Sequence, residues 1–245
     1  MKRVLLVGHS HLACIRQAFD QRDGEVTGLA LEFVPLADPY FLPNLDAAGG
    51  VHPHIRRVVT APRFDAVVSV IGGNAHFSLG LVNNPRRYDF VLPEAPDLPL
   101  EPGAEILPHD LLLRHLTAMS HETTPVLAAL RALVPGKPFV HLESPPPVPA
   151  ENVNLHARHF APLIRQYGLS RRERVWRFWR MQARMMQHIC AAEAITYLPV
   201  PDSMTDGDGM LVRAAWRDDP THAGPAYGHA VLDQLSAYFA ARSVT

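Results

Sequence analysis

The chain has 245 residues, 47% of them hydrophobic, and its 23 basic and 24 acidic residues give a formal charge of −1. This balance excludes a general electrostatic attraction to nucleic acid or to an anionic membrane. No apolar run approaches the ~18 residues that a membrane-spanning helix needs. The apolar run after Lys2 and Arg3 is too short for a signal peptide, so we expect a cytoplasmic protein without a membrane span. The two cysteines, Cys14 and Cys190, fit reduced and buried thiols.

Short apolar runs alternate with segments of helical periodicity along the whole chain. Runs of this kind suit strands that are buried on both faces of a parallel sheet. The predicted strands are residues 3–7, 31–34, 66–71, 139–142 and 195–198. The predicted helices are residues 11–20, 53–59, 111–133, 171–192 and 227–241. The alternation predicts an α/β fold with a mainly parallel five-stranded sheet, and the length fits a single domain over residues 1–245.

Two proline-rich stretches interrupt this alternation, at residues 83–108 and 144–153. Proline fixes φ and has no N–H to donate, so both stretches are predicted to be surface loops rather than strands. A long loop within a compact domain is often functional. We therefore interpret 83–108 as a lid or as a wall of the substrate site.

The segment 171–192 has apolar residues at helical spacing, which predicts a helix that faces the core. This apolar stripe consists of Val175, Phe178, Trp179, Met185, Met186 and Ile189. The same segment carries six arginines, at Arg171, Arg172, Arg174, Arg177, Arg180 and Arg184. A solvated face is the simplest interpretation of these arginines, and a site for an anionic substrate or partner is the alternative.

Polar residues follow two of the predicted strands, at the edge where open parallel sheets bind their ligands. Ser10 lies in the segment 8–12, near a helix N-terminus whose free N–H groups favour developing negative charge. Taken alone, Ser10 is more simply a helix N-cap. Asn74 lies in the segment 71–76 and offers an amide donor, although a turn asparagine is again the simpler interpretation.

The segment 218–224, shortly before the last predicted helix, places an aspartate three residues ahead of a histidine. Asp219 can reach back to the Nδ1–H of His222 across a tight turn, which would fix the tautomer and leave Nε2 facing a nucleophile. An exposed loop histidine beside a capping aspartate is the alternative explanation of this pair.

These segments together resemble the SGNH (GDSL-like) hydrolase family. That family places a serine after its first strand, a glycine after its second, G-x-N after its third and D-x-x-H near the C-terminus. The matching residues here are Ser10, Gly50 or its neighbour Gly49, Gly72 with Asn74, and Asp219 with His222. The resemblance runs from residue 4 to about residue 240, and His9 departs from it because the family has an aspartate at that position.

The resemblance implies a three-layer α/β/α sandwich with a flavodoxin-like sheet. It also implies a serine esterase, or alternatively an acyltransferase, that acts on a short acyl group, such as acetyl, on a sugar or small metabolite. Ser10 would be the nucleophile, His222 its base and Asp219 the residue that orients the base. The oxyanion hole would consist of Ser10, Gly50 and Asn74. The residues expected to line the substrate site are His11, Gly73 and His76. No cofactor and no metal are implied.

Two other classes of function remain as alternatives. The histidine-rich segments around His9, His11 and His76, with His52 and His54, are similar to pieces of dinuclear metallophosphoesterases. Those enzymes carry the G-H-x-H piece near the C-terminus and open with D-x-H, which is absent here. A protein that only binds its ligand would have no reason to hold a serine, an asparagine and an Asp-x-x-His pair together.

Overall fold

The computed structural model describes residues 1–72, 74–149 and 160–242, and its centre is a five-stranded sheet of order β2-β1-β3-β6-β7. Every ladder of this sheet is parallel. The strands are β1 (Lys2–Gly8), β2 (Leu29–Pro35), β3 (Ala66–Val70), β6 (Phe139–Leu142) and β7 (Thr196–Leu198). All five predicted strands are therefore confirmed, with small shifts at their ends.

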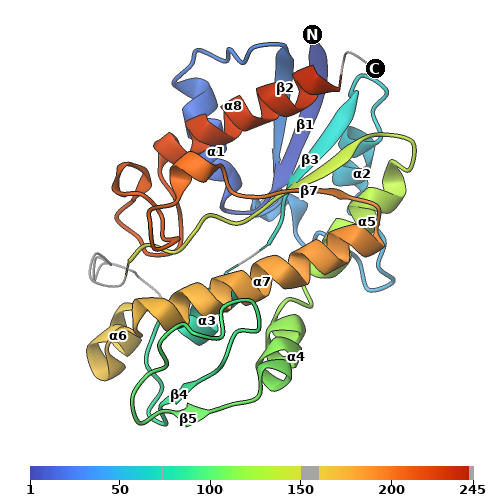
Figure 1. Cartoon of the computed structure of the whole chain (residues 1–245). Coiled ribbons are helices and arrows are strands. Elements are labelled where there is room, and N and C mark those ends of the chain that lie inside the picture. The colour runs from blue at the N-terminus through green and yellow to red at the C-terminus, as the bar shows by residue number, and fades with distance from the viewer. Residues whose placement is uncertain (73, 150–159, 243–245) are drawn as a thin grey trace.

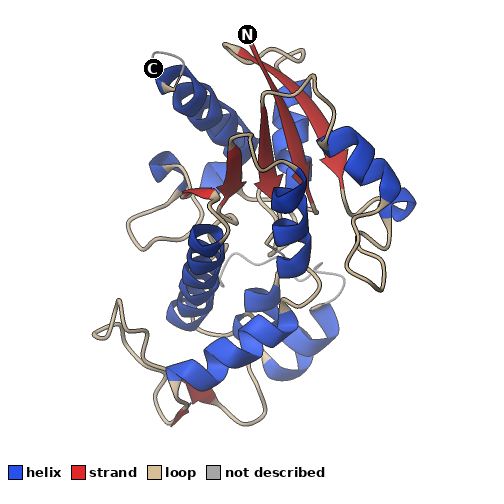
Figure 2. Ribbon diagram, turned by 90° about the vertical axis from the view of Figure 1, so that its right-hand side faces the viewer, coloured by secondary structure: helices blue, strands red, loops and turns tan. Residues whose placement is uncertain are grey.

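Helices cover both faces of the sheet (Figures 1 and 2). One face packs against α1 (Leu12–Asp20) and α8 (Pro225–Ala241). The other face packs against α2 (Pro53–Val59), α5 (Thr124–Leu133) and α7 (Arg172–Ala192). The expected three-layer α/β/α sandwich is confirmed.

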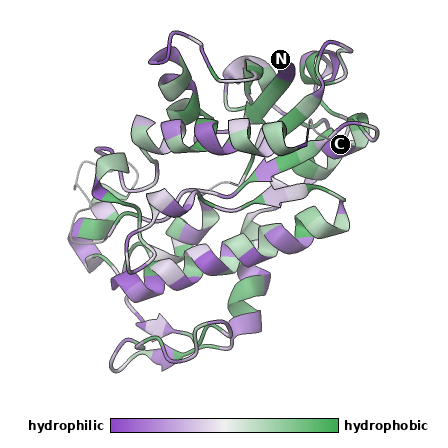
Figure 3. Cartoon of the chain, turned by 45° about the horizontal axis from the view of Figure 1, so that its top comes forward, coloured by the Kyte–Doolittle hydropathy of each residue, from purple (hydrophilic) through white to green (hydrophobic). Residues whose placement is uncertain are grey.

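Alternate side chains of the central strand β1 supply the two cores. Val4 and Leu6 belong to the core beneath α1 and α8, while Leu5 and Val7 belong to the core on the opposite face. All four side chains are fully buried. This pattern follows from the two-residue period of a strand, and Figure 3 shows the sheet as an apolar band between helices of mixed polarity.

The structure contains further elements. They are α3 (Ala75–Gly80), β4 (Tyr88–Asp89), β5 (Glu105–Ile106), α4 (His109–Met119), α6 (Ala161–Tyr167) and the 3-10 turns η1 (Pro39–Phe41), η3 (Asp202–Met204) and η4 (Arg213–Ala215). Of these only α4 overlaps a predicted helix. The prediction of one helix over 111–133 is wrong, because α4 ends at Met119 and α5 begins at Thr124. Pro125 explains the break, since proline is tolerated in the first turn of a helix but disrupts its interior.

Both proline-rich stretches differ from the surface loops that were expected. Residues 83–108 contain a short parallel ladder in which β4 pairs with β5. Residues 145–149 are buried, and the carbonyl of Pro147 accepts the Leu211 N–H at 2.9 Å. Because a proline has no N–H, burying it leaves one fewer backbone donor to satisfy. Residues 150–153 of the second stretch lie outside the described residues.

The apolar stripe of α7 packs into the core as predicted, but the arginines on this helix do not all form a solvated face. Arg174 and Arg177 are each only 1% exposed. The Arg177 guanidinium binds both carboxylate oxygens of the buried Asp89 at 3.0 Å and donates to the carbonyls of Leu98 and Pro99. These contacts attach the stretch 83–108 to α7.

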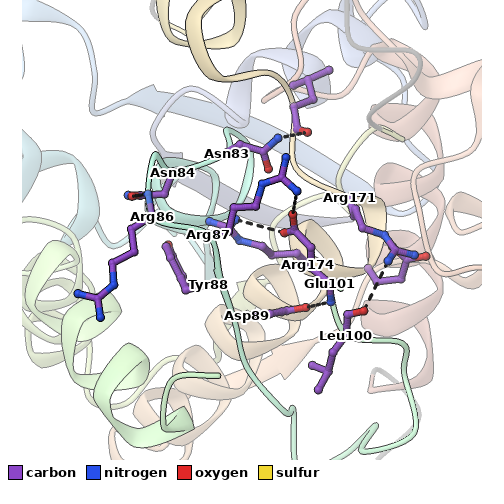
Figure 4. A network of polar contacts seen from close by, with 12 residues as sticks. Asn83, Asn84, Arg86, Arg87, Tyr88, Asp89, Leu100, Glu101, Arg171 and Arg174 are labelled. Atoms are coloured by element: carbon purple, nitrogen blue, oxygen red, sulfur yellow. Dashed lines mark hydrogen bonds and ion pairs between the residues drawn. The ribbon is translucent and has the colours of Figure 1, made fainter. Parts of the chain in front are cut away.

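A second set of contacts surrounds this buried pair (Figure 4). The Asp89 carboxylate also accepts the Glu101 N–H at 2.8 Å. Arg87 and Arg174 approach the Glu101 carboxylate at 3.5 and 4.0 Å, and the Arg174 guanidinium lies over the Tyr88 ring at 4.2 Å. The stretch 83–108 is therefore held against α7 by buried charges, beyond what its apolar contacts provide.

Replacing Arg177 by methionine is expected to lower the free energy of unfolding by about 3–5 kcal/mol, because the Asp89 carboxylate would stay buried without its cation. The loss is measured by urea denaturation at neutral pH. Arg172→Met is the matched control, since Arg172 lies on the same helix and pairs with Asp208 in solvent. An exposed pair contributes at most about 1 kcal/mol, so equal losses in the two variants would contradict this account.

The cysteines and the helix lengths bear on two further expectations. Cys14 and Cys190 are free and buried, as predicted. Within residues 1–72, 74–149 and 160–242, no helix combines the length and the apolar character needed to cross a membrane.

Candidate active site

The serine predicted as nucleophile lies in the turn between β1 and α1, at the carboxyl edge of the sheet. Gly8 ends β1 beside Val70, and a Cβ on Gly8 would lie 2.6 Å from the Val70 carbonyl oxygen. Since that oxygen belongs to the backbone of β3, no larger residue fits at this position. Gly8 therefore allows the close approach of two strands, and the chain turns directly after it.

Ser10 is exposed at this turn, and its backbone N–H has no acceptor among the described residues. The N-cap of α1 is His11, and no side chain caps this helix. The simpler interpretation of Ser10 as a helix cap therefore does not apply. Its free N–H and exposed side chain suit a group that meets a ligand.

Asp219 and His222 form the pair that their spacing predicts. The Nδ1 of His222 lies 2.8 Å from Oδ1 of Asp219. The same oxygen accepts the backbone N–H of His222 at 2.9 Å and both the N–H and the hydroxyl of Thr221 at 2.9 and 3.0 Å. The tight turn thus holds the carboxylate and the imidazole in one fixed arrangement.

The electrostatics of the pair favour an ionised Asp219. Partial burial alone would raise the pKa of this carboxyl group, but the hydrogen bonds from His222 and Thr221 outweigh it and hold the pKa well below its usual range. A carboxylate that accepts Nδ1–H leaves the other nitrogen of the ring as an acceptor. The Nε2 of His222 is buried and has no hydrogen-bond partner among the described residues.

Asn74 is the N-cap of α3, four residues after the last residue of β3, and its side chain contacts the residue next to Ser10. The Nε2 of His11 lies 2.9 Å from Oδ1 of Asn74. The ring of His11 also lies 5.3 Å from the ring of His222, measured between centroids. His11 therefore connects the asparagine after β3 with the histidine before α8.

His11 and His76, both expected to line the substrate site, are buried instead. His11 is 5% exposed and His76 is fully buried. The Nδ1 and the backbone N–H of His76 both contact Oε1 of Gln182, at 3.0 and 3.1 Å, so this side chain is occupied within the protein. Gly73, the third residue of that prediction, lies outside the described residues.

The glycines after β2 are engaged within their own turn. The Gly50 N–H donates to Oδ1 of Asp46 at 2.8 Å, and the Gly49 N–H donates to the Asp46 carbonyl at 2.9 Å. Neither N–H is available to an oxyanion in this arrangement. The predicted role of Gly50 would require the Asp46 carboxylate to release it.

His9, the residue that departs from the family pattern, is attached to the loop after β2. Its Nε2 lies 3.2 Å from Oδ1 of Asn44, and Nδ2 of Asn44 donates to the carbonyls of Leu36 and Phe41. Asn44 is buried and was not predicted as a site residue. The sequence offers no signal for it, because its partner His9 lies far away along the chain.

The histidine-rich segments do not assemble a metal site in the part of the chain that the structure describes. No group of three or more His, Cys, Asp or Glu side chains there is arranged to hold a metal ion. The rings of His9 and His11 contact Asn44 and Asn74 instead. The metallophosphoesterase alternative therefore has no support in these residues.

The structure brings most of the predicted groups to one edge of the sheet but leaves one contact open. No hydrogen bond joins the Ser10 hydroxyl to Nε2 of His222 among the described residues. Such nucleophile–base contacts are often loose until a substrate binds. The connection between the two residues is through His11, which follows Ser10 in the chain and packs beside His222.

Comparisons with known proteins support this fold at low sequence identity. No family model and no curated protein matches the chain. A solved structure from Streptococcus pneumonia, provisionally described as a platelet activating factor, has a TM-score of 0.52 at 13% identity and covers 97% of this chain and 83% of that one.

Two further solved structures are less similar. A GDSL-like lipase from Bacteroides thetaiotaomicron has a TM-score of 0.48 at 12% identity, with 99% and 89% of the two chains covered. Est24, a carbohydrate acetylesterase from Sinorhizobium meliloti, has a TM-score of 0.45 at 11% identity, with 98% and 99% covered. The similarity to the first of these three structures supports the fold of this chain, a parallel five-stranded sheet between helical layers.

Proposed function

We propose that this protein is a serine esterase that removes a short acyl group, such as acetyl, from a sugar or a small metabolite. One observation carries the proposal. Asp219 holds Nδ1 of His222 at 2.8 Å, while Nε2 of the same ring is buried without a partner. An imidazole held in this way can act as a general base. Ser10 is exposed and immediately precedes His11, whose ring packs beside that of His222.

The proposed reaction has two halves. The Ser10 hydroxyl attacks the ester carbonyl and gives its proton to Nε2 of His222, which passes it to the oxygen of the leaving alcohol. Water then attacks the acyl group on Ser10 and loses its proton to the same nitrogen, which returns it to Ser10 as the acid departs. Asp219 stabilises the imidazolium in both halves, because its own pKa is held low and it stays ionised.

Two donors support the oxyanion in this proposal. The Ser10 N–H is free of acceptors among the described residues, and the Asn74 amide has Nδ2 left over once His11 holds its oxygen. The Gly50 N–H is occupied by Asp46, so the proposal does not depend on it. Each such donor typically contributes about 10²–10³ in kcat.

A panel of acyl esters tests the function directly. We expect the purified protein to release nitrophenol from short-chain nitrophenyl esters and acetate from acetylated sugars, with turnover falling as the acyl chain lengthens. Adding an alcohol to the assay shows whether the acyl group passes to water or to a hydroxyl. Folded protein that leaves every ester intact would contradict the proposal.

A further inference from the structure

The residue after the proposed nucleophile lies between the two other parts of the site. His11 contacts Asn74 through Nε2 at 2.9 Å, and its ring lies 5.3 Å from that of His222. His11 is 5% exposed, so it is enclosed by protein and does not face the solvent side of the site. Its contacts therefore act on neighbouring side chains.

The ring of His11 is neutral and has a defined tautomer. Burial, with the neighbouring His222 and His76, lowers the pKa of His11 to about 3. A neutral imidazole carries one N–H, and Nδ1 of His11 is buried without an acceptor. A proton on Nδ1 would lose its hydrogen bond to water without replacement, whereas on Nε2 it meets Oδ1 of Asn74. The proton therefore lies on Nε2, and His11 donates to Asn74.

This donation determines which end of the Asn74 amide faces the site. A primary amide has an oxygen and an NH₂ group of almost the same shape, and a half-turn about χ2 exchanges them. With Oδ1 held by His11, Nδ2 is directed away from His11 and has no partner among the described residues. The exchanged amide would present an oxygen to a developing oxyanion and repel it.

The backbone around Asn74 is fixed separately, by Gln182 on α7. Its Nε2 donates to the Gly72 carbonyl at 3.0 Å, and its Oε1 accepts from the backbone of His76 at 3.1 Å. Gln182 thus holds the chain on both sides of Asn74. Among the described residues, His11 is the side chain that contacts the Asn74 amide.

We propose that His11 is a positioning residue for the oxyanion hole, which donates Nε2–H to Oδ1 of Asn74 and so keeps Nδ2 directed at the developing oxyanion. This inference rests on the proposed function, since it assigns how one of its two donors is kept in place. His11 itself touches neither the substrate nor the reacting atoms.

A double-mutant cycle between His11 and Asn74 tests the inference with a short-chain nitrophenyl ester. We expect His11→Leu to lower kcat about 10- to 100-fold with little change in KM, which is less than the ~10²–10³ expected for Asn74→Ala. His11→Leu added to Asn74→Ala should cause no further loss, because the residue that His11 positions is already gone. Additive losses in the cycle would overturn the inference.

Two shorter replacements keep the test decisive if His11→Leu does not fold. Glutamine can bring an amide N–H near the position of Nε2, whereas asparagine is too short. We expect His11→Gln to retain kcat within about tenfold and His11→Asn to lose more, in proteins of equal melting temperature. Equal activities in these two variants would contradict a positioning role. His121→Gln, a matched change at a 73% exposed histidine, should leave kcat unchanged.

Failure of the proposed function would look different. If Ser10→Ala retains full esterase activity, the nucleophile assignment is wrong, whatever His11 does. If Ser10→Ala is inactive and Asn74→Ala is slow, but His11→Leu and His11→Asn match the unmodified protein, only the positioning role is wrong.

Discussion

Ser10→Ala is expected to abolish esterase turnover, with a loss in kcat on the order of 10⁶, the scale measured for the nucleophile of a serine protease. The reason is that the variant has no oxygen to form the acyl intermediate, so only the residual catalysis of the oxyanion donors remains. The measurement is the steady-state rate with a short-chain nitrophenyl ester, corrected for spontaneous hydrolysis.

The fold should be unaffected by this change. Ser10 is exposed, and its hydroxyl makes no hydrogen bond to a described residue. The melting temperature of Ser10→Ala should therefore equal that of the unmodified protein. Ser203→Ala, a matched change at an exposed serine in η3, should leave both activity and melting temperature nearly unchanged. An active Ser10→Ala would remove the basis of the proposed mechanism.

Asp219→Asn is expected to lower kcat by about 10⁴, the cost of the equivalent change in a Ser-His-Asp protease. Oδ1 of Asp219 accepts Nδ1–H of His222 together with the N–H and hydroxyl of Thr221. An amide at this position is neutral, and with its NH₂ toward the ring it would favour a proton on Nε2. His222 would then be unable to accept the proton of Ser10.

Two observations can distinguish the specific effect of Asp219→Asn from that of losing any negative charge nearby. They are the pH dependence of activity and the effect of a change at the neighbouring Asp218. Because the pKa of Asp219 is held below its usual range, its carboxylate should stay ionised and support activity down to acidic pH. Asp218→Asn removes the same charge one residue earlier, from an exposed side chain. We expect Asp218→Asn to keep its activity, and a comparable loss in both variants would argue against the specific role of Asp219.

Sequence periodicity predicts best those strands that are apolar on both faces. The central strands β1, β3 and β6 are buried on both faces, so their apolar runs identify them without knowledge of their partners. Asp219 and His222 were predictable for a different reason. They are three residues apart, and their contact is therefore local.

The contacts that decide the rest of the site are distant in sequence. From the sequence, Arg177 is indistinguishable from the surface arginines of the same helix. The structure shows that it pairs with the buried Asp89, far earlier in the chain. Gln182 on α7 likewise forms hydrogen bonds to Gly72 and His76. No local sequence pattern predicts these bonds. A single sequence gives no information on such pairs, so the buried charges on α7 and the support of the Asn74 turn could not be predicted.

His11 illustrates how a residue near the site can be identified from the sequence although its contacts cannot. The sequence places it next to Ser10, which is why it was expected to contact the substrate. In the structure the first turn of α1 directs its ring inward, where it is buried against Asn74 and His222. Which way a side chain points after a turn depends on packing, and packing is what the sequence alone does not show.

Covalent labelling with a fluorophosphonate tests the central claim most directly. Such a probe forms a bond to a serine only where a base and an oxyanion hole activate it. The account predicts a single adduct, located on Ser10 by peptide mass spectrometry, that disappears in Ser10→Ala and is slowed in Asp219→Asn. Folded protein that gains no adduct, or gains it on another serine, would contradict the account.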